Sequence, residues 1–174
     1  MPEPILFVIT VIGDDRPGLV GELAAVISQH NGNWLESSMA NLAGKFAGIV
    51  KLAVPTSRAE SLKAALSALA GLTVMVAVSA RPSVPGGRKL KLSLIGHDRI
   101  GIVKEVSQVL ARHAVNVEEL ATHVSSAPMS AETLFHAQAK LSAPADFDRN
   151  ALTTELERLS NDLMVDIAMD ETIS

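Results

Sequence analysis

Hydrophobic and polar residues follow each other along this chain in a pattern that changes period and then starts again. Residues 5–12 form a nearly unbroken β-branched and aliphatic run, which predicts a strand buried on both faces. Residues 89–95 alternate lysine or serine with leucine, which predicts a half-exposed strand. After these strands in the sequence, apolar residues recur at the spacing of one helix face over residues 19–27 and 102–110. Each half of the chain therefore predicts a strand followed by an amphipathic helix.

The first half continues with two strands, a helix and a last strand. The two strands are expected at about 33–41 and 45–54, with a short turn between them. Ser57 and Glu60 have the spacing of a capping box, which predicts that a helix begins there. A strand over residues 72–79 completes the half.

The second half repeats this order with a longer hairpin tip. The tip is expected at residues 125–131, the following helix at about 148–160, and the final strand near 163–169. The order β-α-β-β-α-β predicts an α+β fold of two ferredoxin-like βαββαβ modules in tandem. Each module would be an antiparallel four-stranded sheet with both helices on one face.

The two halves also share sequence. Residues 13–40 align with residues 96–123 without a gap, 83 positions apart, and 10 of the 28 pairs are identical. This period is too long for a solenoid repeat and long enough for a small domain. We expect a first domain at residues 1–80 and a second at 89–174, joined by a proline- and glycine-rich linker at 81–88.

Composition and charge narrow the function classes. The chain is 48% hydrophobic but only 3% aromatic, which predicts aliphatic cores and no row of aromatic side chains for stacking bases. It has no cysteine, which excludes disulfides, thiolate catalysis and cysteine zinc sites. Neither half is basic, since residues 1–87 hold six basic and six acidic side chains and residues 88–174 hold nine and thirteen. We therefore expect no direct DNA binding. No leader or membrane-spanning run is evident, so a cytoplasmic protein without membrane contact is expected.

The loop between the first strand and first helix of each half is the candidate ligand site. Backbone N–H groups at a helix N-terminus favour a carboxylate, and Gly18 and Gly101 leave room for one to approach. Arginine adds attraction for an anion, and aspartate or asparagine oxygens can accept from an ammonium group. The candidate ligand-binding residues are Asp15, Arg16, Gly18, Asn33, His97, Asp98, Arg99, Gly101 and Asn116.

The same residues also allow purely structural roles. The glycines could serve sharp turns, the aspartates could cap the helices, and the arginines could pair with local carboxylates. The second loop differs from the first, because Ile100 replaces Pro17 and His97 replaces Asp14. His97 could contact a ligand or make binding depend on pH. The two loops are therefore not expected to be equivalent.

The loops carry a family resemblance. Asp15–Val20 directly after a strand, with Asn33 opening the next strand, resembles the ACT domain, and Asp98–Val103 with Asn116 repeats the pattern. The resemblance implies a regulatory module that binds amino acids. In the second hairpin, Ser126–Ser130 followed by Leu134-Phe135 is similar to the ACT proteins that repress transcription of the glycine cleavage system.

Three function classes can be compared. The first is a non-enzymatic regulator that responds to a small amino acid, with glycine as the first candidate, and acts through a partner transcription factor. The alternative is an allosteric amino-acid sensor subunit acting on a metabolic enzyme. An enzyme is not expected, because no nucleophile–base pair or metal cluster is evident. No catalytic residue, metal or cofactor is therefore predicted, and a homodimer is left open.

Overall fold

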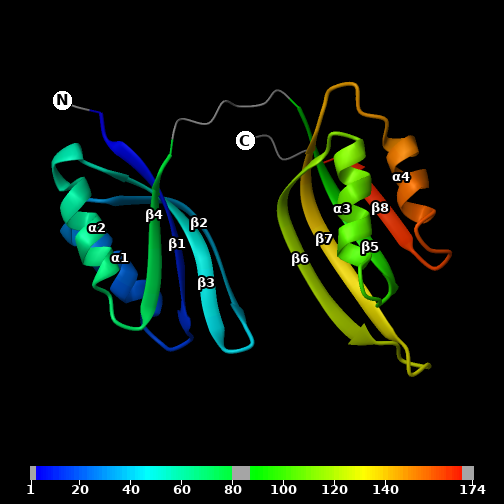
Figure 1. Cartoon of the computed structure of the whole chain (residues 1–174), viewed down its shortest axis with the longest axis horizontal. Coiled ribbons are helices and arrows are strands. Elements are labelled where there is room, and N and C mark those ends of the chain that lie inside the picture. Colours follow the sequence, from blue (N-terminus) through cyan, green and yellow to red (C-terminus); the bar gives the residue numbers. More distant parts are fainter. Residues whose placement is uncertain (1–2, 80–86, 170–174) are drawn as a thin grey trace. The chain divides into compact units, whose positions relative to one another are not determined.

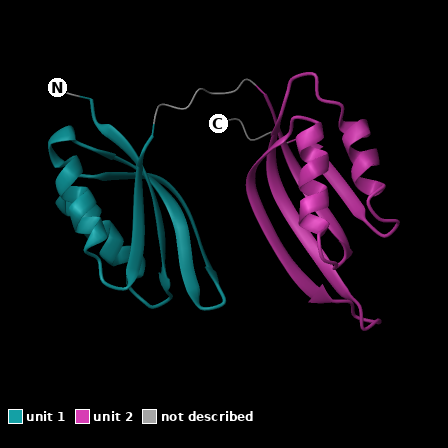
Figure 2. Cartoon of the chain, in the orientation of Figure 1, with its two compact units in different colours: residues 1–83 teal, residues 84–174 magenta. Residues whose placement is uncertain are grey.

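The computed structural model describes residues 3–79 and 87–169, which fall into two compact units (Figure 2). Unit 1 is residues 1–83 and unit 2 is residues 84–174. Most of the predicted linker, residues 81–86, lies outside the described residues, and Arg88 is the first residue of a strand.

Unit 1 has the predicted order of elements (Figure 1). Its strands pair in the order β2-β3-β1-β4, and every pairing is antiparallel. Helices α1 and α2 lie together on one face of this sheet. The elements are β1 (Ile5–Asp14), α1 (Leu19–Gln29), β2 (Asn33–Leu42), β3 (Lys45–Val54), a 3-10 turn (Thr56–Arg58), α2 (Ala59–Ser67) and β4 (Leu72–Val78).

Unit 2 repeats this topology with strand order β6-β7-β5-β8. The repetition extends to detail, because the edge strand has a register shift between Trp34 and Glu36 in unit 1 and between Val117 and Glu119 in unit 2. The α+β prediction of two ferredoxin-like modules is confirmed. The elements are β5 (Arg88–His97), α3 (Ile102–Arg112), β6 (Asn116–Ser126), β7 (Thr133–Ala143), α4 (Arg149–Glu157) and β8 (Met164–Met169).

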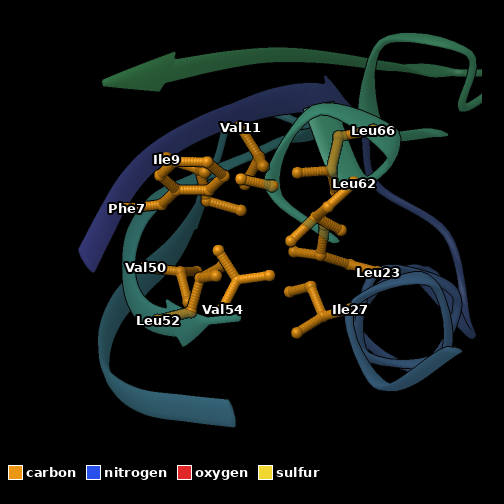
Figure 3. Close-up of a cluster of buried hydrophobic side chains, with 11 residues drawn as sticks. Phe7, Ile9, Val11, Leu23, Ile27, Val50, Leu52, Val54, Leu62 and Leu66 are labelled. Atoms are coloured by element: carbon orange, nitrogen blue, oxygen red, sulfur yellow. The ribbon is translucent and has the colours of Figure 1, made fainter. Parts of the chain in front are cut away.

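Each unit has its own hydrophobic core between the sheet and the two helices. In unit 1, alternate residues of the central strands point toward the apolar faces of α1 and α2 (Figure 3). The labelled side chains are Phe7, Ile9, Val11, Leu23, Ile27, Val50, Leu52, Val54, Leu62 and Leu66, all of which are buried. In unit 2, Leu90 and Leu92 of β5 pack in the same way against Leu152 and Leu156 of α4.

The prediction that the first strand is buried on both faces is wrong. Phe7, Ile9 and Val11 are buried, but Ile12 on the other face is 50% exposed. The helices cover one face of the sheet, so β1 follows the two-residue period of a half-buried strand although its sequence is apolar on both sides. The unbroken apolar run therefore predicted less exposure than this strand has.

The uncovered sheet faces of the two units differ in polarity. In unit 1, Thr10 pairs with Ile49 on one side and with Met75 on the other, and these two side chains are 52% and 70% exposed. The same row in unit 2 is Gln138, Ser93 and Asp166. The uncovered face of unit 1 is therefore apolar at positions where unit 2 is polar.

One detail of the predicted helices also needs correction. The capping box at Ser57 and Glu60 does not form, because residues 56–58 make a 3-10 turn and α2 begins one residue later without a side-chain cap. In unit 2, Asp148 does cap α4, since its Oδ1 accepts from the Ala151 amide at 3.0 Å. Within the described ranges, no helix is long and apolar enough to cross a membrane.

Candidate functional site

The candidate site in each unit is the loop between the first strand and the first helix. Both loops end in a glycine that precedes the helix, Gly18 with φ 89° and Gly101 with φ 91°. This left-handed conformation strains any residue with a Cβ atom, although no atom lies within 4 Å of where a Cβ would be. Glycine is therefore needed at these two positions for the backbone conformation.

The loop aspartates do not cap the helices, since neither helix has a side-chain cap. They connect the loop to the neighbouring hairpin instead. The Asp15 amide donates to the Gly44 carbonyl at 2.9 Å, and the Asp15 carboxylate accepts from the Asn41 side chain. In unit 2, the Asp98 amide donates to the Thr133 carbonyl, also at 2.9 Å. Each loop is thus hydrogen-bonded to the start of the third strand of its own sheet or to the turn before it.

The loop arginines are paired with glutamates of the following helix. Arg16 makes a bidentate pair with Glu22, with Nη1–Oε1 and Nη2–Oε2 distances of 2.9 and 2.6 Å. Arg99 pairs with Glu105 at the matching position of unit 2. The hydrogen bond from arginine lowers the pKa of each glutamate. Neither guanidinium is left unpaired to attract an anion.

Arg16→Gln is expected to raise the pKa of Glu22 toward its ordinary value, and Arg99→Gln to do the same for Glu105. Because the glutamate pKa is lowered in the folded state, each pair stabilises the fold above the ordinary pKa of glutamate. That contribution disappears as the pH falls through the lowered pKa. Carboxyl-carbon NMR measures both values, and each variant should leave the pKa of the other unit's glutamate unchanged.

The asparagines lie far from the loops of their own units. Asn33 pairs with Ala53, which in turn pairs with Leu6 near the start of β1, whereas the loop follows Asp14 at its end. Eight residues of strand separate these positions by roughly 26 Å at about 3.3 Å per residue. Asn116 is placed in the same way, opposite Ser142 and Lys89. Within one unit, the structure does not bring the asparagine and the loop together.

His97 lies between two carboxylates. Its Nε2 is 2.7 Å from Glu132 Oε2, and its Nδ1 is 2.6 Å from Asp162 Oδ2. Its backbone N–H donates to the same Asp162 oxygen at 2.7 Å. The hydrogen bond with Glu132, followed by the charges of Asp162 and Glu132, raises the pKa of His97.

Sequence reasoning did not single out the carboxylates that contact these loops. Glu22 and Glu105 are identical in the aligned repeat and follow each arginine by six residues, so the repeat itself carried a signal for them. Glu132 and Asp162 gave no such signal. They are 35 and 65 residues from His97 in sequence, and only the folded sheet brings them to it.

Unit 2 also has an apolar groove that borders α3 and the edge strand β6. Its lining includes Val103 and Leu120, which are 44% and 52% exposed. In unit 1, Trp34 and Met39 pack against the core beside α1. Val117 and Thr122 stand 83 positions later and line the groove. The smaller side chains of unit 2 thus border open space where larger ones pack in unit 1.

Comparison with known proteins agrees with this architecture. The family model described as the ACT domain matches residues 6–78 and 89–170. The chain is 24% identical over 160 residues to the glycine cleavage system transcriptional repressor of Escherichia coli K12, and equally to that of Shigella flexneri, covering 90% of this chain and 84% of each relative. A solved structure described as an unknown protein from Galdieria sulphuraria is 29% identical, with a TM-score of 0.85 and coverage of 97% of this chain and 99% of that one. The chain belongs to the ACT-domain family and contains two such domains in tandem.

Proposed function

We propose that this chain is a non-enzymatic regulator that responds to a small amino acid and represses transcription of the glycine cleavage system through a partner transcription factor. The observation that carries the proposal is the tandem pair of ACT domains combined with similarity, over 90% of the chain, to the glycine cleavage system transcriptional repressor of Escherichia coli. A role in transcription without a membrane contact is consistent with a cytoplasmic protein.

Action through a partner is supported by charge. The chain has a formal net charge of −4, and neither half is basic. Proteins that bind DNA directly neutralise several phosphates with lysine and arginine. In the described part of this chain, many of the basic side chains are paired with acidic ones, including both loop arginines. These features favour contact with a protein over contact with DNA.

We place the carboxylate of the ligand at the N-termini of α1 and α3. The first-turn amides of a helix have no partner within the helix and carry partial positive charge. Because Arg16 and Arg99 are paired with Glu22 and Glu105, backbone amides are the donors that this proposal requires. Asp15, which shares the loop with Gly18, is the proposed acceptor for the ammonium group. Asn33 and Asn116 stay predictions from the family resemblance.

Two measurements test the proposed function. In a thermal-shift screen against the twenty amino acids, glycine or another small amino acid should raise the melting temperature, since a ligand specific to the folded state stabilises it. In a gel-shift assay with glycine cleavage promoter DNA, the chain alone should not bind, and it should alter the complex formed by the transcription factor. Tight DNA binding by the chain alone would contradict the partner mechanism.

A further inference from the structure

The two loops are connected to their hairpins by ion pairs of different chemistry. In unit 1, the Lys45 ammonium pairs with Asp14 at the end of β1, and its hydrogen bond lowers the pKa of that carboxyl. Lysine and aspartate both stay charged over the whole range around neutral pH. His97 stands at the position of unit 2 that matches Asp14, and its partner in the β6–β7 hairpin is Glu132. The basic member of the unit 2 pair is therefore a histidine, the side chain that titrates near neutral pH.

The geometry around His97 fits a protonated ring. Both ring nitrogens are within 2.7 Å of a carboxylate oxygen, one from Glu132 and one from Asp162. An imidazolium has two N–H donors and satisfies both carboxylates, whereas a neutral imidazole has one. In the neutral state, one carboxylate would therefore face a nitrogen lone pair.

The carboxylate that loses its contact on deprotonation is Glu132. Asp162 keeps two other donors, the His97 backbone N–H and the Ser160 hydroxyl. Among the described residues, Glu132 has only the Ser130 hydroxyl besides His97, at 3.4 Å, and its side chain is 59% exposed. Water can replace the histidine at Glu132 more easily than at Asp162, whose side chain is 31% exposed.

We propose that His97, Glu132 and Asp162 form a proton-dependent latch that holds the tip of the β6–β7 hairpin against the loop leading into α3. The latch is closed when the imidazole is protonated and open on the Glu132 side when it is neutral. Glu132 lies at the hairpin tip, where its carbonyl accepts from the Ala127 amide at 2.9 Å. Opening frees the tip that carries Met129, which is fully exposed at 99%. The latch does not depend on amino-acid binding.

Two other charged residues, Arg99 and Asp98, lie near the latch. Arg99 lies close enough to Asp162 to interact with its charge, and it is also paired with Glu105. Asp98 is the next residue in the chain. The carboxylates of Glu132 and Asp162 outweigh the opposing effect of desolvation, so the pKa of His97 is raised. A raised histidine pKa means that the contact is present at low pH and is lost as the pH rises through the raised value.

Amide hydrogen exchange measured by NMR tests the latch with an internal reference. Protection of the Ala127 and Asp98 amides, corrected for intrinsic exchange, should fall by about two- to fivefold as the pH is raised through the titration of His97, the range expected for an exposed ion pair. The Asp15 amide occupies the matching position in unit 1, beside the permanently charged Asp14–Lys45 pair. Its protection should not change over the same range.

Two variants of His97 imitate the closed and the open state of the latch. His97→Lys carries a permanent charge and should keep protection high at every pH, while His97→Gln is permanently neutral and should keep it low. His123 and His136 stack on the same hairpin, with ring centroids 4.4 Å apart, so a substitution at His123 changes another histidine of this hairpin and leaves the latch residues in place. His123→Gln is therefore the matched control and should retain the wild-type response. A flat wild-type profile, or a pH response that persists in His97→Gln, would overturn the proposal.

Discussion

Replacing Gly13 by alanine is expected to lower the free energy of unfolding by about 3 kcal/mol. A Cβ atom at this position of β1 would lie 2.3 Å from the Gly71 carbonyl oxygen and 2.9 Å from a methyl group of Leu72. The first obstacle is backbone, which cannot rotate away, so the chain ahead of β4 has to shift. Urea unfolding followed by fluorescence of Trp34, the single tryptophan of the chain, measures the effect in unit 1.

Alanine variants of two other glycines serve as controls for the steric explanation of the Gly13→Ala result. At Gly96, the equivalent position of unit 2, the nearest atom to an added Cβ is a methyl group of Leu163 at 2.6 Å. A side chain can change rotamer, so Gly96→Ala should cost only about 1 kcal/mol. Gly21 lies in α1 with no atom within 4 Å of an added Cβ, and Gly21→Ala should leave stability unchanged or raise it by up to about 1 kcal/mol. Equal losses in all three variants would contradict the steric explanation.

Phe7→Ala is expected to lower the free energy of unfolding by about 3–5 kcal/mol, because it leaves a cavity in the fully buried core of unit 1. Ile12→Ala, five residues later on the opposite face of the same strand, should cost no more than about 1 kcal/mol, since Ile12 is 50% exposed. Urea unfolding monitored by Trp34 fluorescence and far-ultraviolet circular dichroism measures both. If Ile12→Ala costs as much as Phe7→Ala, the uncovered face of unit 1 is buried in solution.

The fold was predictable because the repeat and the periodicity agree. The aligned residues 13–40 and 96–123 lie in the same elements of both units. Helix periodicity over residues 19–27 identifies the buried residues Leu19, Leu23 and Ile27 of α1, although Val20, which the same pattern includes, is exposed. The exposure of β1 was not predictable from its own sequence. An apolar strand is compatible with burial on one face or on two, and only the position of both helices on the same side decides between them.

The candidate site was predictable only in part. The left-handed glycines follow from the strand–loop–helix pattern, and the structure has them at Gly18 and Gly101. The pairing of each arginine with a glutamate depends on the turn that α1 and α3 make after the loop, which sequence spacing alone does not define. The separation of Asn33 from its loop follows from strand direction, because β2 begins at the end of the sheet opposite the end of β1.

The most direct test of the central claim is isothermal titration calorimetry of glycine into the wild-type chain, with Gly18→Val and Gly101→Val as the loop variants. Valine is poorly tolerated at a left-handed position and should disrupt the loop amides. We expect wild-type binding at millimolar affinity or better and a loss of binding in the variant of each loop that forms a site, while Gly21→Ala binds like the wild type. The absence of binding by glycine and every other amino acid at millimolar concentration, or unchanged binding when both valines are combined, would contradict an amino-acid sensor built on these loops.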